Sequence, residues 1–159
     1  MAAKTDLSKL NCSLARALAA VGDWWTLLIV RDAFLGVGRF GDFQRSLGIA
    51  RNILSARLAA LVDAGILARR GSPARPTYGL TEKGREMMPA LVALMQWGDK
   101  WESAGRPPMI ATDADGVAVR PVQVISRAGK AVAADQVRLL PGPGATKRTR
   151  DFMLAKGRR

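Results

Sequence analysis

The sequence predicts an α+β protein that is mainly helical, and three observations support this class. Apolar residues recur every three or four positions over most of residues 7–103. Two short runs, 66–70 and 77–81, are typical of strands joined by turn residues. A Gly-Arg-Pro-Pro stretch at 105–108 then begins a tail of different composition. We therefore predict one domain over residues 1–105 and a C-terminal extension over residues 106–159.

The predicted helices are separated by glycines. The apolar spacing predicts helices over 7–21, directly after Asp23, around 40–47, over 49–64 and over 81–103. Asp23 can cap the second of these helices, and Gly48 and Gly65 end the third and fourth. The predicted buried stripe of the fourth helix is Ile53, Leu54, Leu58 and Leu61.

The extension is predicted to contain a small β-hairpin. Residues 117–124 and 132–140 are rich in β-branched side chains, and turn residues stand at 115–116 and 128–129. A Pro-Gly linker at 141–144 follows. For the basic segment 147–159, a frayed helix and a disordered tail both remain open.

The charge balance is strongly positive. The chain has 25 Lys and Arg residues against 13 Asp and Glu residues, which gives a net charge of +12. Such a chain attracts polyanions through its long-range field and through release of counterions. Charge alone leaves DNA, ribosomal RNA and an anionic membrane as candidate partners.

The sequence also excludes several kinds of chemistry. It has no histidine and a single cysteine, Cys12, whereas a structural zinc site needs about four Cys or His ligands and the common nucleophile pairs need histidine. We therefore expect no metal, no cofactor and no enzymatic activity. The first ten residues have no targeting pattern, and the apolar run 24–30 is too short for a membrane span. A cytoplasmic protein without a membrane partner is expected.

The predicted order of elements is that of a helix-turn-helix with a wing. The major groove of DNA admits one α-helix, the preceding helix braces it, and a basic hairpin can reach phosphates. Residues 39–75 hold seven arginines and two acids. For any one of these polar residues a merely solvated position is the alternative. The predicted DNA-binding residues are Arg39, Arg51, Asn52, Ser55, Arg57, Arg69, Arg70 and Arg75.

Five stretches resemble the HxlR family of winged-helix regulators, which are relatives of the MarR group. They are CSLAR at 12–16, VGDWWTLLI at 21–29, RFGDF at 39–43, GIARNIL at 48–54 and YGLTEKG at 78–84. The resemblance covers residues 12–101 and follows the order of the family. It implies a bacterial, homodimeric transcriptional regulator that binds duplex DNA at a pseudo-palindromic operator. It also implies an interface built from the first and last helices of the domain.

The last predicted helix supports a dimer independently, because one small domain cannot bury all of its large apolar side chains. Covering the core of the same subunit is the alternative. The predicted interface residues are Leu10, Leu14, Leu91, Leu94, Met95, Trp97 and Trp101. The resemblance further suggests an unknown small-molecule effector, for which Trp24 and Trp25 are the candidate pocket residues and plain packing is the alternative.

The chain departs from the family pattern at four places. Many relatives have serine at the position of Ala50, and alanine cannot cap a helix through its side chain. Trp24 stands where a basic residue is usual, and the wing loop is shorter than is common. The extension resembles the extra segment of one branch of the family, and that segment looks like a small zinc ribbon with pairs of cysteines. At its cysteine positions this chain has Asp115, Ile125 and Ala128, so we expect a hairpin without metal.

Cys12 matches the cysteine with which some family members sense oxidants or electrophiles. Lys9 and Arg16 stand at i−3 and i+4 on the same predicted helix, and cations so placed favour the reactive thiolate. A packing role for Cys12 is the alternative.

An RNA-binding or ribosome-associated module is the second class of function that the sequence allows. The basic residues 147–159 favour it. Proteins that bind single strands stack bases on aromatic side chains, and Phe152 is the one aromatic residue of this segment. Competition between duplex DNA and RNA distinguishes the two classes.

Overall fold

The structure is a computed structural model that describes residues 6–156, and the chain divides into two compact units. Residues 20–122 form one unit, and residues 6–19 form the other together with residues 123–156. Contacts thus group residues 106–122 with the helical unit, whereas the sequence assigned them to the extension. One cause is Gln96, whose side chain accepts from the amide of Val122 at 2.8 Å and donates to the carbonyl of Arg120 at 3.2 Å.

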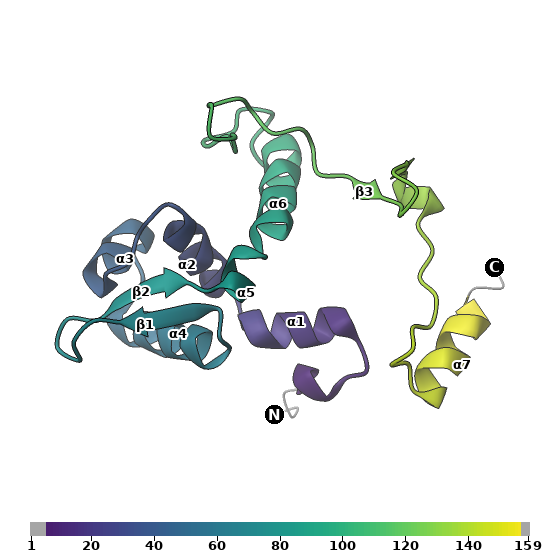
Figure 1. Ribbon diagram of the computed structural model, residues 1–159, viewed down its shortest axis with the longest axis horizontal. Helices are drawn as coiled ribbons and strands as arrows, with labels where there is room; N and C mark the ends of the chain where they lie inside the picture. The colour runs from purple at the N-terminus through teal and green to yellow at the C-terminus, as the bar shows by residue number, and fades with distance from the viewer. Residues whose placement is uncertain (1–5, 157–159) are drawn as a thin grey trace. The chain divides into compact units, whose positions relative to one another are not determined.

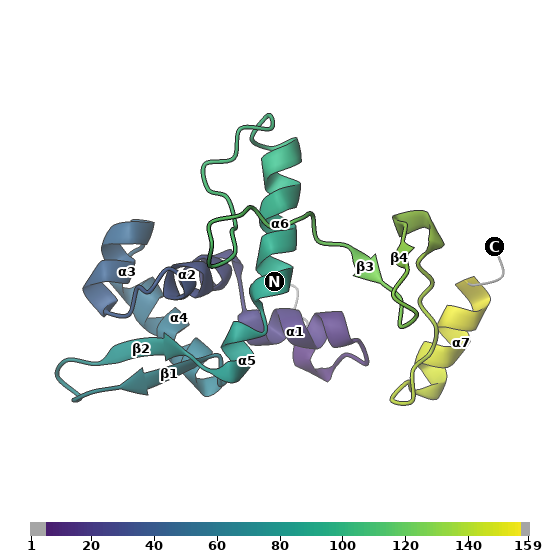
Figure 2. The same ribbon diagram turned by 45° about the horizontal axis from the view of Figure 1, so that its top comes forward.

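The helical unit confirms the predicted α+β class. Its elements are α1 (Ser13–Val21, which begins in the other unit), α2 (Trp24–Phe34), α3 (Phe40–Leu47), α4 (Arg51–Asp63), β1 (Leu67–Arg70), β2 (Thr77–Leu80), α5 (Glu82–Arg85) and α6 (Met88–Trp101). Figures 1 and 2 both show β1 and β2 beside α4, with α6 projecting from this core. The Asp23 side chain caps α2 by accepting from the amide of Thr26, as predicted.

The strands form an antiparallel hairpin that is tied to the segment before α3. Leu67 pairs with Leu80 and Arg70 with Thr77. Arg39 makes an isolated bridge to Thr77, and the amide of Tyr78 donates to the carbonyl of Gly38 at 2.7 Å. The hairpin is therefore fixed to the beginning of α3 by backbone hydrogen bonds.

A single core holds α2, α3, α4 and the hairpin together. Its most buried side chains include Ile29, Phe43, Leu54, Leu58, Leu61, Ile66 and Leu67. The predicted stripe of α4 is correct at three of its four positions. Ile53 is 37% exposed, because the buried positions 54, 58 and 61 follow the helical repeat and residue 53 lies outside their arc.

Two predicted long helices are divided in the structure. The helix predicted over 81–103 consists of α5 and α6, because Pro89 in the first turn of α6 has no N–H to continue the ladder from α5. The helix predicted over 7–21 consists of a 3-10 turn, η1 (Leu7–Lys9), and α1, with an extended backbone at Leu10 between them. The prediction of one continuous helix was therefore wrong for both segments.

The second unit contains short elements only. They are η1, β3 (Val124–Ile125), β4 (Ala131–Val132), η2 (Ala134–Gln136) and α7 (Lys147–Lys156). A hairpin is present, but the predicted strands 117–124 and 132–140 shrink to two residues each. Pro121 cannot donate to a ladder in the first run, and the η2 turn replaces the second. The basic segment is helical over α7; the part of it beyond residue 156 lies outside the described residues.

Within residues 6–156, no one helix has the length and apolar character of a membrane span, although the adjoining helices α1 and α2, bent by 73°, together reach that length and composition. In the same residues, no three His, Cys, Asp or Glu side chains are grouped so that they could hold a metal ion.

Candidate nucleic-acid interface

The second helix of the helix-turn-helix begins without a side-chain cap. Gly48 ends α3 in the left-handed conformation, and the N-cap residue of α4, Ala50, offers no side-chain acceptor. The first amides of α4 therefore have no side-chain partner. Free amides at a helix N-terminus bind anions such as phosphate.

The exposed face of α4 combines polar side chains with small ones. Arg51, Asn52 and Ser55 are exposed, and so are Ala56 and Ala59. The small alanines let the helix backbone come close to a groove, while the polar residues reach base edges. The Arg51 guanidinium lies over the Phe40 ring, 5.4 Å from its centroid, which limits the positions it samples.

Arg57 was predicted to lie on the DNA-binding face, and the structure places it elsewhere. Its guanidinium forms an ion pair with Asp23, and its Nε is buried without a partner among the described residues. Asp23 thus caps α2 with one carboxylate oxygen and holds α4 with the other. The pair joins residues 34 positions apart, so no local pattern in the sequence indicates it.

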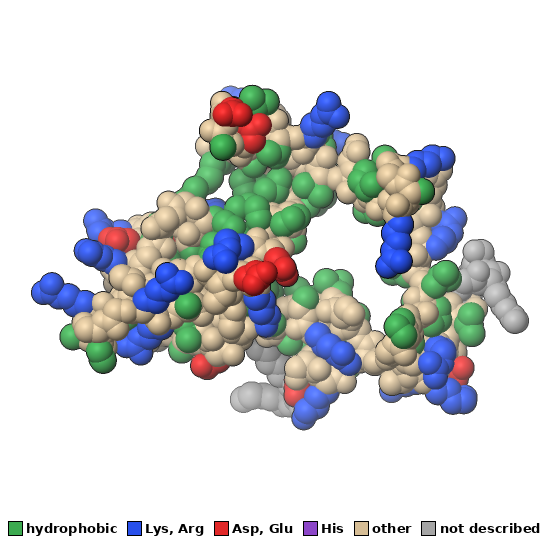
Figure 3. All heavy atoms as spheres, viewed as in Figure 1, with side chains coloured by type: hydrophobic (Ala, Val, Ile, Leu, Met, Phe, Trp, Pro, Cys, Tyr) green, Lys and Arg blue, Asp and Glu red, His purple; other side chains and the backbone are tan. Residues whose placement is uncertain are grey.

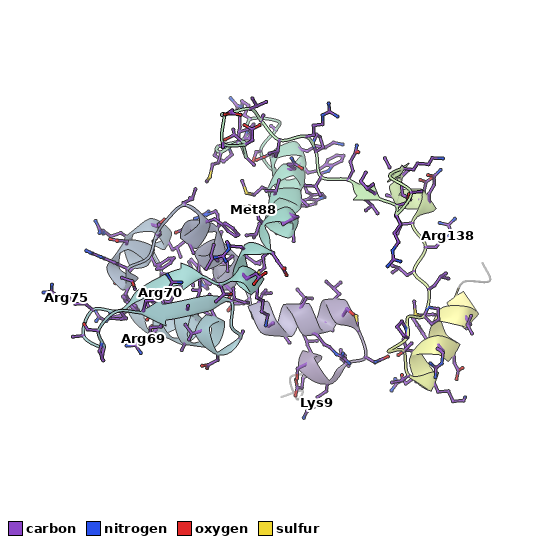
Figure 4. The ribbon with its side chains drawn as sticks, viewed as in Figure 1. Lys9, Arg69, Arg70, Arg75, Met88 and Arg138 are labelled. Carbon is purple, nitrogen blue, oxygen red and sulfur yellow. The ribbon has the colours of Figure 1, made fainter. Side chains whose placement is uncertain are left out.

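The hairpin carries the remaining predicted cations. Arg69, Arg70 and Arg75 are exposed, and Figure 4 shows Arg75 at the loop beyond the strands. The loop is shaped by Gly71 at φ 82° and by the amide of Arg75, which donates to the carbonyl of Ser72 at 3.1 Å. Arg39 is exposed at the beginning of α3. Figure 3 shows Lys and Arg side chains gathered over α3, α4 and the hairpin.

Most of the predicted interface residues are exposed in the single chain. Trp97 and Trp101 are 55% and 62% exposed, and Leu10, Leu14 and Leu94 are also exposed. Met95 is half-buried. Leu91 is 8% exposed and belongs to the core of its own subunit, so its assignment to a free interface needs correction.

An apolar cavity lies between α2 and α6. It has a volume of about 220 Å³ and is lined by Leu27, Leu28, Arg31, Leu91, Leu94 and Met95. Nε and Nη2 of Arg31 both donate to Oδ1 of the buried Asp32, at 2.9 and 2.7 Å. This pairing leaves little net charge at the cavity.

The predicted pocket tryptophans lie apart from this cavity. Trp24 is exposed and stacks on the half-buried Trp25, with ring centroids 4.1 Å apart. Neither Trp24 nor Trp25 lines this cavity or the cavity between α6 and residues 107–119.

Cys12 is a free, exposed cysteine, so it is no packing residue of this subunit. The two cations expected to act on it are engaged elsewhere. Lys9 pairs with Asp6 at 3.3 Å, and Nε of Arg16 donates to the carbonyl of Leu10 at 3.1 Å. The Ser8 hydroxyl and amide donate to Asp6 and hold the pKa of its carboxyl below its ordinary value, so Asp6 remains a charged partner for Lys9.

A braced helix with a free N-terminus, an exposed polar face and an adjoining basic hairpin define a winged helix-turn-helix DNA-binding protein. The model of the HxlR-like helix-turn-helix family matches residues 20–106. The chain belongs to this family and is a transcriptional regulator with a helix-turn-helix fold.

Relatives and solved structures agree with the family match. An uncharacterized helix-turn-helix transcriptional regulator of Mycobacterium tuberculosis is 43% identical over 83% of this chain and 87% of its own length. The crystal structure of PA1607, described as a proposed transcription factor, has a TM-score of 0.73 with 40% identity over 85% of this chain and 98% of that one. The solved structure of PA1374 from Pseudomonas aeruginosa has a TM-score of 0.64 with 37% identity, over 89% of this chain and 99% of that one.

Proposed function

We propose that the protein binds duplex DNA sequence-selectively, as a homodimer on a pseudo-palindromic operator, and acts by binding rather than by catalysis. The observation that carries the proposal is the exposed beginning of α4, where uncapped amides adjoin Arg51, Asn52 and Ser55. Amides suit a phosphate, and Arg and Asn suit the major-groove edges of guanine and adenine. As a DNA-bound regulator it would work in the cytoplasm.

The exposed apolar side chains of α6 support the dimer. Leu94, Trp97 and Trp101 fall at spacings of three and four, so they lie along one side of the helix. Burying such a stripe against a second copy is favourable by roughly 25 cal/mol per Å² of apolar surface. A two-fold dimer presents two copies of α4 to half-sites about one DNA turn apart.

We propose the cavity between α2 and α6 as the place for a small-molecule effector. This cavity is partly open to solvent and has a volume of about 220 Å³, and an enclosed apolar cavity of about 150 Å³ is large enough for benzene. Because Arg31 is paired with Asp32, we expect a small, uncharged, apolar ligand.

The test is selection of duplexes from a random library by the purified protein, followed by titration of the selected duplex. Arg51→Ala should weaken binding to that duplex by about 1–3 kcal/mol and relax the preference at one base step. Arg106→Ala, which removes an exposed cation outside the helix-turn-helix, is the control and should not change the preference.

Three results would contradict parts of the proposal. If Arg51→Ala lowers the affinity for selected and for random DNA equally, Arg51 does not contact a base edge. Enrichment of no sequence at all would refute sequence-selective binding. Displacement of the selected duplex by RNA at lower concentrations than by DNA would favour the RNA-binding alternative.

A further inference from the structure

The unit formed by residues 6–19 and 123–156 carries a second group of cations that the helix-turn-helix does not include. The eight Lys and Arg side chains of residues 6–19 and 123–155 are exposed, as are the three carboxylates, Asp6, Asp135 and Asp151. Figure 3 shows Lys and Arg side chains along the segment that contains α7. The exposed cations are Lys9, Arg16, Arg127, Lys130, Arg138, Lys147, Arg148 and Arg150.

The carboxylates neutralise only part of this charge. Asp6 pairs with Lys9, and Asp151 pairs with Lys147 at 3.0 Å. Among residues 6–156, the side chains of Arg127, Lys130 and Arg148 make neither a hydrogen bond nor an ion pair. These three cations are therefore available to an external anion.

The helix that carries Arg148 is held in place by Asn11, a residue from the other end of the chain. The Asn11 amide donates to the carbonyl of Gly144 at 3.0 Å, and its oxygen accepts from the amide of Thr146 at 2.9 Å and from the hydroxyl of Thr149 at 2.7 Å. The hydroxyl of Thr146 in turn accepts from the amide of Thr149. The beginning of α7 is thus attached to the N-terminal segment, and its cations project from an ordered scaffold.

We propose that this unit is a second DNA-contacting surface, which binds the phosphate backbone of duplex outside the sequence read by α4. The inference rests on the proposed function, because the duplex held by α4 is the polyanion to which the unit is tethered. Tethering gives its cations a high effective concentration near that duplex. Lys and Arg side chains without a groove-reading element bind phosphate irrespective of sequence.

Two other polyanions fit the same residues less well. Single-stranded RNA is bound on aromatic platforms, and Phe152 is the only aromatic side chain of this unit within residues 6–156. An anionic membrane favours a helix with segregated apolar and basic faces, whereas α7 has a weakly amphipathic sequence.

The experiment compares two duplexes with the full-length protein. One is the selected sequence alone, and the other adds unrelated duplex on each side, about 15 base pairs and so longer than one helical turn. The variant Arg127→Gln/Arg148→Gln removes two unpartnered cations. Its control, Arg106→Gln/Arg120→Gln, removes two exposed arginines of the other unit and has the same net charge.

We expect the wild type to bind the longer duplex more tightly and with a steeper dependence on salt. Each neutralised phosphate contributes about 0.9 to the slope of log affinity against log salt, so the variant should flatten that slope on the longer duplex by about 1.8 per subunit. This corresponds to a difference of about 12-fold per subunit between roughly 50 and 200 mM salt. The control should bind both duplexes as the wild type does.

The outcomes separate this inference from the proposed function. Equal affinity of the wild type for the two duplexes, or equal effects of the variant and its control, would overturn the inference and leave sequence-selective binding intact. In a competition experiment, duplex RNA and unrelated duplex DNA are added to the complex with the longer duplex. If RNA abolishes the extra affinity for the longer duplex at a lower concentration than DNA does, the inference is also overturned. If the wild type binds the short selected duplex no more tightly than a random duplex of the same length, the proposed function itself is refuted.

Discussion

Gly84 is the position where one added methyl group should do most damage to the fold. It is buried in α5, and a Cβ built on it would lie 2.3 Å from the carbonyl oxygen of Ile66 and 3.0 Å from a methyl group of Leu80. The Ile66 carbonyl cannot move freely, because it accepts a hydrogen bond from the amide of Thr81 at 3.1 Å. The single hydroxyl proton of Thr81 is shared between the carbonyls of Gly65, at 2.6 Å, and Ile66, at 3.1 Å. In Gly84→Ala either α5 moves away from the hairpin or these bonds lengthen.

Three contributions set the expected magnitude. Alanine is better than glycine in a helix by about 1 kcal/mol. Overpacking opposes this by about 1–3 kcal/mol, and each strained hydrogen bond adds about 0.5–1.5 kcal/mol. The net loss in the free energy of unfolding should be about 2 kcal/mol. For a chain of this size, such a loss lowers Tm by about 4–8 °C.

Urea unfolding followed by tryptophan fluorescence and by circular dichroism measures this loss. The matched control is Gly41→Ala, because Gly41 lies in α3, has an ordinary φ and has no atom within 4 Å of its built Cβ. The control should be as stable as the wild type or gain up to about 1 kcal/mol. Gly84→Ala with unchanged stability would refute the tight contact between α5 and the hairpin.

Three further predictions concern other contacts. Asp23→Ala removes the cap of α2 and leaves Arg57 unpaired, so it should lower the free energy of unfolding, measured in urea, by about 1–3 kcal/mol. The control, Asp63→Ala, removes an exposed carboxylate and should change this free energy little. Equal effects of the two variants would contradict the dual role of Asp23. Trp101→Ser should shift sedimentation toward monomer, and an unchanged dimer would exclude Trp101 from the interface. Because Cys12 is exposed, an aromatic disulfide reagent should modify it in the folded protein. A mild oxidant should then weaken DNA binding by the wild type and not by Cys12→Ser, and equal losses would show that Cys12 is not a sensor.

Local signals in the sequence predicted the helix-turn-helix closely. Gly48 and Gly65 end α3 and α4 at the predicted places, because both adopt a left-handed conformation that glycine tolerates best. The spacing of Leu54, Leu58 and Leu61 placed α4 correctly on the core. These features depend on residues close together in the chain, so they can be recognised without coordinates.

Features that depend on distant residues were not predictable in this way. The pairing of Arg57 with Asp23 and the attachment of α7 by Asn11 join segments whose proximity follows from the complete fold. A pattern of charges assigned Arg57 to the exposed face because it cannot show which acid lies opposite. The break between α5 and α6 is a different case. Pro89 is a local signal for a helix boundary, but the prediction of one helix over 81–103 followed the apolar spacing and disregarded the proline.

The hydrogen bond from Tyr78 to Gly38 has a mechanical consequence for regulation. Together with the bridge between Arg39 and Thr77, it attaches the hairpin to the beginning of α3, so we expect the hairpin and the helix-turn-helix to move together. For the proposed dimer, we therefore expect a regulatory signal to change the distance or the angle between the two copies of α4, while each copy keeps its own geometry. Such a signal would change the half-site spacing that the proposed dimer prefers, rather than the base preference within each half-site.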